Sequence, residues 1–364
     1  MVNGPANLIS LLKPVAVSVA APSAGRHRSA SQICPAELAL YSLTGRANSP
    51  FLNQHTASYS EAFPMTRFFL AIAATAALLF CQTPPQTSPL TPQRPGIESN
   101  VLYGMYSGLA LLMDVHYPEK PNGYGVIFIS GSGWSATQEY NAEPLKQGSQ
   151  SQLYGPRLTA VGYTVFSLSH RAAPRFHYPA QIEDVQRAVR FVRHNAQRFN
   201  VRADRIGAVG GSSGGHLVEY LGVSGDGIMD DPDPVNRESA KVQCVVARAA
   251  PADLFRMNVT HFMGMPAPDP KVRNTVEDRA YRQASPITHV SASAAPMLLI
   301  HGDADKTVPF EQAELMEKAL RAAGVPTRLL RIPGGDHGPT FPGAKNPPDY
   351  MGEMVRWLDQ YLKQ

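Results

Sequence analysis

The feature that most constrains this chain is a predicted strand, a glycine-rich turn and a helix start that follow one another within residues 205–217. The run reads Arg-Ile-Gly-Ala-Val-Gly-Gly-Ser-Ser-Gly-Gly-His-Leu. A turn this sharp leaves no room for side chains at Gly210 and Gly214, and it exposes the serine between them at a sheet edge. The first amides of the following helix can then stabilise a developing oxyanion. The run predicts a nucleophile elbow with Ser212 at its apex.

Other interpretations of this run fit the sequence less well than the elbow does. The same Gly-x-Ser-x-Gly spacing also fits Ser213, but we favour Ser212 because Gly210 directly follows the apolar strand in that frame. A phosphate-binding loop would need a lysine after the glycines, where His216 stands instead. His216 itself lies one helical turn after Ser212, so we expect it to pack in the interior rather than to act as a base.

Charge and cysteine content argue against nucleic-acid binding and against a metal site. The chain has 33 Lys and Arg against 29 Asp and Glu, a net charge of +4. Residues 1–81 account for +3 of this surplus, and the rest of the chain has no basic run that could neutralise several phosphates. The three cysteines are too far apart for a disulfide framework or a paired-cysteine zinc site. The acidic residues between 226 and 233 match no calcium-binding loop.

From residue 98 onward, short apolar or β-branched runs alternate with longer amphipathic runs, which indicates a mostly parallel sheet flanked by helices. We read this part of the chain as one domain. The segments 223–241 and 252–294 fit the alternation poorly and are candidate lids over the carboxyl edge of the sheet. The expected helices are 179–199, 311–323 and 347–362. The expected strands are 98–105, 109–117, 124–130, 163–169, 205–210, 242–249, 297–302 and 327–332.

Several short motifs accompany the elbow. Residues 170–174 read His-Arg-Ala-Ala-Pro, residues 178–180 read Tyr-Pro-Ala, and the acidic pair Glu183 and Asp184 follows. With the elbow, these motifs make residues 98–364 resemble the α/β-hydrolase fold, and within it small bacterial carboxylesterases of the hormone-sensitive-lipase and feruloyl- or acetyl-esterase type. The resemblance implies a sheet of about eight strands with flanking helices and small lid insertions. It also implies a serine carboxylesterase that needs no metal or organic cofactor.

A serine hydroxyl is a weak nucleophile at neutral pH, so Ser212 needs a base, and that base needs a carboxylate. The family's acid loop is similar to residues 301–309, where the second aspartate, Asp305, is the expected triad member. Asp303 is the competing choice, and we expect it to cap the turn. The family's histidine loop is similar to the Pro-Gly-Gly-Asp-His-Gly run that contains His337, the expected general base. The order Ser, Asp, His is that of the fold.

The oxyanion hole is expected after the third strand, where such esterases carry His-Gly-Gly-Gly-Trp and residues 130–134 read Ser-Gly-Ser-Gly-Trp. Two side chains differ, but backbone amides bind the oxyanion, so the change is tolerable if the loop keeps its shape. A plain turn with a packing tryptophan is the alternative. By resemblance, the donors are the amides of Ser132, Gly133 and Ser213. The expected substrate-pocket residues are Trp134, Tyr140 and Phe262.

A separate pattern begins at Met65. A short positive region is followed by thirteen uncharged, mostly apolar residues, 68–80, and then by Cys81. This pattern is typical of a secretory signal, because a membrane span needs about 20 apolar residues. Residues 78–81 resemble a lipoprotein cleavage box, although Phe80 stands where that box has a small residue. The sequence therefore leaves open whether Cys81 is lipidated.

The sequence thus divides into four segments. Residues 1–64 are expected to be a non-structural extension upstream of the true start, 65–81 a signal peptide, 82–97 a proline-rich linker, and 98–364 the catalytic domain. We expect an exported protein whose partner is a small-molecule or carbohydrate ester. We expect contact with a membrane only through a lipid anchor at Cys81.

Two other functions stay open on the sequence. Serine peptidases of the prolyl-oligopeptidase type share these motifs, but the segment between the signal and the first strand is too short for even one blade of the propeller that gates those enzymes. A catalytically silent binding protein could also keep the fold. The ordered serine, aspartate and histidine argue against that alternative.

Overall fold

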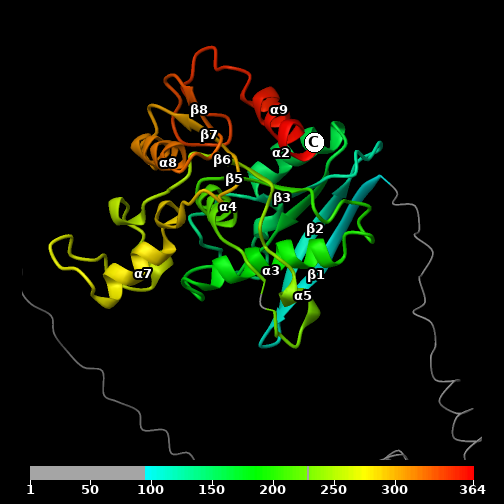
Figure 1. Cartoon of the computed structure of the whole chain (residues 1–364), viewed down its shortest axis with the longest axis horizontal. Helices are drawn as coiled ribbons and strands as arrows, with labels where there is room; N and C mark the ends of the chain where they lie inside the picture. Colours follow the sequence, from blue (N-terminus) through cyan, green and yellow to red (C-terminus); the bar gives the residue numbers. More distant parts are fainter. Residues whose placement is uncertain (1–94, 228) are drawn as a thin grey trace, which may run out of the picture. The chain divides into compact units, whose positions relative to one another are not determined.

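The computed structural model describes residues 95–227 and 229–364 (Figure 1). The predicted upstream extension at 1–64 and signal peptide at 65–81 lie outside the described residues, as does most of the predicted linker at 82–97. The first strand begins at Gly96. Among the described residues, no helix combines the length and the hydropathy that crossing a bilayer requires.

A sheet of eight strands organises the described residues, in the order β1-β2-β4-β3-β5-β6-β7-β8. β1 pairs antiparallel with β2, and β2 pairs antiparallel with β4, whereas all other neighbours pair in parallel. This topology confirms the predicted mostly parallel sheet. The strands are β1 Gly96–Tyr106, β2 Leu109–Tyr117, β3 Gly125–Ile129, β4 Thr164–Leu168, β5 Ile206–Gly211, β6 Cys244–Arg248, β7 Met297–Gly302 and β8 Thr327–Ile332.

Helices cover both faces of the sheet (Figure 1). α2 and α9 pack on one face, and α3, α4 and α8 pack on the other. The strands between these layers are apolar on both faces: in β3, Val126 and Phe128 face α2 and α9, whereas Ile127 and Ile129 face the opposite layer. The helices are α2 Ser149–Ala160, α3 Ala180–His194, α4 Ser213–Val223, α5 Pro234–Arg237, α6 Thr260–Met263, α7 Val276–Ala284, α8 Glu311–Ala322 and α9 Tyr350–Leu362, with 3-10 turns η1 Leu145–Gln147, η2 Leu254–Arg256 and η3 Pro286–His289.

The predicted strands and helices are present, and several helices that were not predicted accompany them. All eight predicted strands form, and α3, α8 and α9 correspond to the three predicted helices, although α3 ends at His194 rather than at residue 199. Helix α2 was not predicted, because it lacks a clear apolar stripe and contains Gly155 and Pro156. Its buried Tyr154 stacks on Phe128 of the sheet, with ring centroids 5.9 Å apart. Packing on the sheet therefore stabilises a helix that local preference does not.

One of the two predicted lid segments lies at the wrong edge of the sheet. Segment 223–241 joins the end of α4 to the start of β6, so it lies at the amino ends of the parallel strands. There it packs on α3, where Arg190 donates hydrogen bonds to the carbonyl oxygens of Asp226 and Glu238, at 2.8 and 3.1 Å. The lid prediction for this segment is wrong, because glycine, aspartate and proline mark a loop without indicating its edge.

The other segment, 252–294, leaves the carboxyl end of β6 and contains η2, α6, α7 and η3. Its helix α6 contacts the loop that follows β3: the rings of Phe262 and Trp134 stack with centroids 4.6 Å apart. This segment therefore lies at the edge of the sheet where the sequence predicted it.

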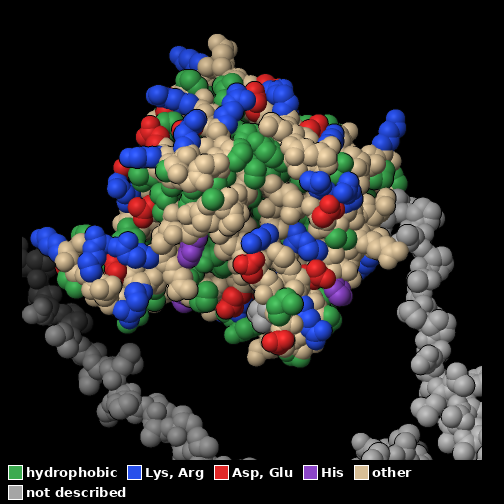
Figure 2. Space-filling model, viewed as in Figure 1, with side chains coloured by type: hydrophobic (Ala, Val, Ile, Leu, Met, Phe, Trp, Pro, Cys, Tyr) green, Lys and Arg blue, Asp and Glu red, His purple; other side chains and the backbone are tan. Residues whose placement is uncertain are grey.

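Basic and acidic side chains are interspersed over the face of the domain seen in Figure 2. The structure contains surface pairs such as Arg328 with Glu353 and Arg331 with Asp303, both at 2.7 Å. Exposed pairs of this kind contribute little to stability. The mixed surface agrees with the near balance of charge in this part of the sequence.

Candidate active site

The elbow after β5 has the strained geometry that its sequence predicts. Ser212 has a positive φ of 55° with ψ −126°, a conformation that costs free energy for any residue with a side chain. A Cβ atom at Gly210 would lie 2.4 Å from the carbonyl oxygen of Gly214, and one at Gly214 would lie 2.1 Å from that of Ile129. Only glycine fits at either position, so the backbones of the strand, the turn and α4 lie in direct contact.

The two adjacent serines have different partners. The hydroxyl of Ser212 is partly exposed and lies 3.0 Å from Nε2 of His337. The hydroxyl of Ser213 is buried and accepts a hydrogen bond from the backbone amide of Ser132 at 2.9 Å. The geometry therefore favours Ser212 as the nucleophile, in agreement with the preferred frame.

The histidine and the acid come from the loops that follow the last two strands. Nδ1 of His337, after β8, lies 2.7 Å from Oδ2 of Asp305, after β7. Because a carboxylate only accepts, Nδ1 carries the proton and Nε2 is free to accept from the Ser212 hydroxyl. The structure thus brings together Ser212, His337 and Asp305, which are far apart in the sequence.

Asp305 is buried and surrounded by donors. Its Oδ1 accepts hydrogen bonds from the amides of Thr307 and Val308, at 2.9 and 2.8 Å, and Nε2 of His301 lies 3.4 Å from its Oδ2. Burial raises the pKa of this carboxyl group, but hydrogen bonds from His301, His337 and the Val308 amide outweigh burial and keep the pKa well below its usual value. The group is therefore a fixed negative charge beside His337.

The competing aspartate, Asp303, has another role. Its Oδ1 accepts a hydrogen bond from the Gly334 amide at 2.7 Å, and its Oδ2 pairs with Arg331 at 2.7 Å. Asp303 therefore ties the acid loop to the histidine loop. Asp336 adds a second tie, since its Oδ1 accepts from the amides of Lys306 and His337, at 3.0 and 2.8 Å.

The loop after β3 lies beside the elbow. A Cβ atom at Gly131 would lie 2.8 Å from Cβ of Ser212, so the loop backbone passes directly against the nucleophile. The Ser132 amide, one of the three expected oxyanion donors, already donates to the side chain of Ser213. Within the described residues, the amides of Gly133 and Ser213 have no internal acceptor. These two amides are the candidate oxyanion donors.

Trp134 and Phe262 do not line an open pocket, which corrects that expectation. Their exposed fractions are 4% and 0%, and they stack on each other beneath the loop. The indole N–H of Trp134 donates to Nδ1 of His216 at 3.1 Å, and Nε2 of His216 donates to the Ala284 carbonyl at 2.8 Å. Burial lowers the pKa of His216 to about 4, so it is neutral at pH 7. The expected packing role of His216 is confirmed.

Tyr140 also differs from its expected place in a pocket. Its side chain is fully exposed, at 108% of the reference area. Tyr140 was predicted only from its residue type and its place in a loop, and neither of these indicates which way the side chain points. Of the three pocket predictions, two residues support the loop from below and one lies in solvent.

Two residues beside the site were not predicted. Nε2 of His261, on α6, donates to the carbonyl oxygen of Gly133 at 2.8 Å, so the segment over the sheet edge contacts the oxyanion loop directly. Arg248 ends β6, and its carbonyl oxygen accepts a hydrogen bond from the Ser212 amide at 2.8 Å. A charged residue at the carboxyl end of an apolar strand was a usable signal for Arg248, whereas nothing in the sequence around His261 distinguished it.

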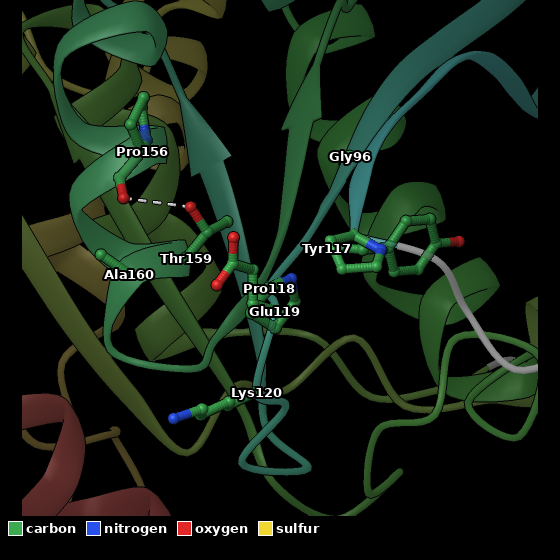
Figure 3. Close-up of a pocket in the computed structure, with 9 residues that line it drawn as sticks. Gly96, Tyr117, Pro118, Glu119, Lys120, Pro156, Thr159 and Ala160 are labelled. Atoms are coloured by element: carbon green, nitrogen blue, oxygen red, sulfur yellow. Dashed lines mark hydrogen bonds between the residues drawn. The ribbon is translucent and has the colours of Figure 1, made fainter.

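A surface hollow of about 570 Å³ lies elsewhere on the domain (Figure 3). It is lined by the end of β2, with Tyr117 and Lys120 nearby, and by Thr159 and Ala160 at the end of α2. That end of α2 leads into the amino end of β4, so the hollow lies at the edge of the sheet opposite the triad. It takes no part in the candidate active site.

Comparison with known proteins supports the interpretation of the chain as an α/β-hydrolase esterase. The family model described as BD-FAE matches residues 113–320. Esterase LipC of Mycobacterium tuberculosis is 29% identical over 306 residues, which cover 78% of this chain and 72% of LipC. Esterase LipQ of the same organism is 31% identical over 218 residues, or 58% of this chain and 49% of LipQ. A solved structure described as a truncated carbohydrate esterase from gut microbiota superposes with a TM-score of 0.61 at 26% identity, covering 75% of this chain and all of the other.

The sheet order, the elbow and the match over more than half of the sequence agree with one another. The chain belongs to the BD-FAE family of α/β-hydrolase carboxylesterases.

Proposed function

We propose that this carboxylesterase hydrolyses short-chain or carbohydrate-linked esters through an acyl-enzyme formed on Ser212. The observation that carries the proposal is the continuous contact from Ser212 through His337 to Asp305, with distances of 3.0 and 2.7 Å. A serine is activated when a base lies within hydrogen-bond reach of its hydroxyl and a third group orients that base.

In the first half-reaction, Ser212 Oγ attacks the ester carbonyl carbon as Nε2 of His337 takes the hydroxyl proton. Asp305 stabilises the imidazolium that forms, and the amides of Gly133 and Ser213 bind the oxyanion. His337 then donates its proton to the leaving alcohol, and the carbon–oxygen bond of the ester breaks. In the second half-reaction a water molecule attacks the acyl-enzyme, His337 takes one of its protons and returns it to Ser212, and the carboxylic acid leaves.

The proposed substrate class rests on similarity and on packing. The carbohydrate esterase from gut microbiota is matched over its whole length by this chain at 26% identity. Trp134 and Phe262 fill the space beneath the oxyanion loop with buried rings. This packing favours a small acyl group beside the loop.

Removal of the Ser212 hydroxyl tests the assigned nucleophile. We expect Ser212→Ala to lower kcat by about 10⁴-fold or more. In the matched variant Ser213→Ala, kcat should fall by several-fold at most, because the backbone amide at this position remains. A fluorophosphonate probe should label the wild-type chain and Ser213→Ala but not Ser212→Ala. Loss of activity confined to Ser213→Ala would contradict the assignment, and a wild-type chain that the probe does not label would favour the silent binding protein.

Replacement of Asp305 tests the role of the fixed charge. We expect Asp305→Asn to lower kcat by about 10⁴-fold, because an amide cannot stabilise the imidazolium. The pKa of Asp305 is lowered on folding, so its charge stabilises the folded chain above about pH 3.9 and this contribution is lost as the pH falls further. In urea titrations, the difference in unfolding free energy between wild type and Asp305→Asn should therefore shrink from about pH 5 to pH 3. A difference that grows over this range contradicts the assigned charge.

A substrate panel tests the proposed class. We expect kcat/KM on p-nitrophenyl esters to be highest for acetyl and to fall with acyl length, because buried rings occupy the space beneath the loop. Acetylated xylan and methyl ferulate should be assayed beside them, with Ser212→Ala as the background. We expect acetate release from the xylan. Faster cleavage of an Xaa-Pro anilide than of any ester would instead favour the peptidase alternative.

We also propose that the chain is exported and that translation starts at Met65. The support is the pattern of residues 65–81, which lie outside the described residues. Intact mass of the protein made in its native host should show a chain without residues 1–64 and without the apolar run. An added lipid on Cys81 would identify the anchored form. A mature chain that retains Met1 would contradict the proposal.

A further inference from the structure

Arg248 is a buried cation without an anionic partner among the described residues. It ends β6, and 2% of its surface is exposed. No carboxylate of the described residues pairs with its guanidinium, and its Nε has no hydrogen-bond acceptor there. Burial of a charge without a counter-ion is costly, and an apolar side chain could fill the same volume at less expense to stability. Packing alone therefore does not explain an arginine at this position.

Aromatic rings and carbonyl oxygens surround this guanidinium. Its central carbon lies 4.5 Å from the ring centroid of Tyr154 and 4.7 Å from that of Phe341, with Tyr350 at 5.9 Å. Such contacts offset part of the cost of burying a cation. Nη2 donates to the carbonyl oxygen of Pro339 at 2.8 Å.

The carbonyl groups that bind Arg248 belong to the histidine loop. Nη2 also lies 3.4 Å from the carbonyl oxygen of Gly338, the residue directly after His337. The hydroxyl of Tyr154 donates to the same Pro339 carbonyl at 2.5 Å. Arg248 and Tyr154 therefore fasten the backbone that carries His337 to the strand and helix beneath it.

The same arginine also contacts the nucleophile through its backbone. Its carbonyl oxygen accepts the hydrogen bond of the Ser212 amide at 2.8 Å. One residue is thus bonded at its main chain to Ser212 and at its side chain to the two residues that follow His337. Ser212 and His337 are 125 positions apart in the chain, and the contact between their reacting atoms is 3.0 Å.

We propose that Arg248 is a positioning residue that sets the distance between Ser212 Oγ and His337 Nε2. The inference rests on the proposed catalytic roles of those two residues. Because Arg248 does not touch the site of the ester, its loss should weaken the chemical step and leave substrate binding nearly unchanged. Small displacements of a catalytic group are enough to lower turnover by about 10²-fold.

The test compares Arg248→Met, Arg248→Lys and Tyr154→Phe in the full chain, with folding checked by circular dichroism and thermal unfolding. We expect Arg248→Met to lower kcat by about 100-fold with KM within about threefold. Arg248→Lys should have a kcat about tenfold higher than that of Arg248→Met, since an ammonium group can still bind one carbonyl. Tyr154→Phe keeps the ring and removes one donor, and should lower kcat by about three- to tenfold.

Arg190→Met is the matched control. Arg190 is also buried, and it also donates to two backbone carbonyl oxygens, but at the opposite edge of the sheet. We expect this variant to unfold at a lower temperature and to keep kcat within about twofold. The downfield proton resonance of the His337–Asp305 hydrogen bond should persist in Arg190→Met and broaden or disappear in Arg248→Met.

Particular outcomes would overturn the proposal. A folded Arg248→Met with wild-type kcat and an unchanged resonance would do so, as would an equal loss of kcat in Arg190→Met. If both Arg248 variants fail to fold, wild-type kcat in Tyr154→Phe contradicts the proposal. Full activity in Ser212→Ala would instead refute the proposed catalytic mechanism, which distinguishes the two failures.

Discussion

Backbone contact without intervening side chains is the constraint on which the whole site depends. At the elbow, Gly214 lies so close to the Ile129 carbonyl that a Cβ atom would come within 2.1 Å of it. At the other end of the site, a Cβ atom at Gly302 would lie 2.1 Å from the Gly335 carbonyl, so the acid loop and the histidine loop touch in the same way. The first contact places Ser212 beside the oxyanion loop, and the second places Asp305 beside His337. Because each contact excludes even a methyl group, the two loops that each contact joins have little freedom to separate.

Burial acts against charge at three positions near the site, and local partners decide the result at each. Asp305 stays ionised because several donors surround it. His216 has one ring nitrogen accepting from Trp134 and the other donating to a carbonyl, which is the bonding of a neutral imidazole. Arg248 is held among aromatic rings and carbonyl oxygens instead of a carboxylate. The same low-dielectric interior thus contains an anion, a neutral base and a cation, each with its own set of partners.

The sequence predicted most of the fold and the candidate triad, but some elements could not be predicted from it. Strands were found from short apolar runs because a parallel sheet covered on both faces needs them, and all eight formed. The triad candidates follow strand ends, and parallel strands bring their carboxyl ends to one edge, so the serine, the aspartate and the histidine could be predicted to meet. Helix α2 escaped prediction because its stability comes from Tyr154 and Leu158 packing on the sheet. The loop at 223–241 was placed at the wrong edge because the prediction rested on its composition, whereas its position between a helix and the next parallel strand fixes it at the amino edge.

The sequence by itself determined the order of the elements, the elbow and the identity of the residues that can perform acyl transfer, because each of these is written in local spacing and residue type. Tertiary structure alone decided that Trp134 and Phe262 support the oxyanion loop from below, that the Ser132 amide binds Ser213, and that Arg248 connects the nucleophile to the histidine loop. Those contacts join residues from different strands and loops. Their directions depend on how the chain packs in three dimensions, which no local pattern specifies.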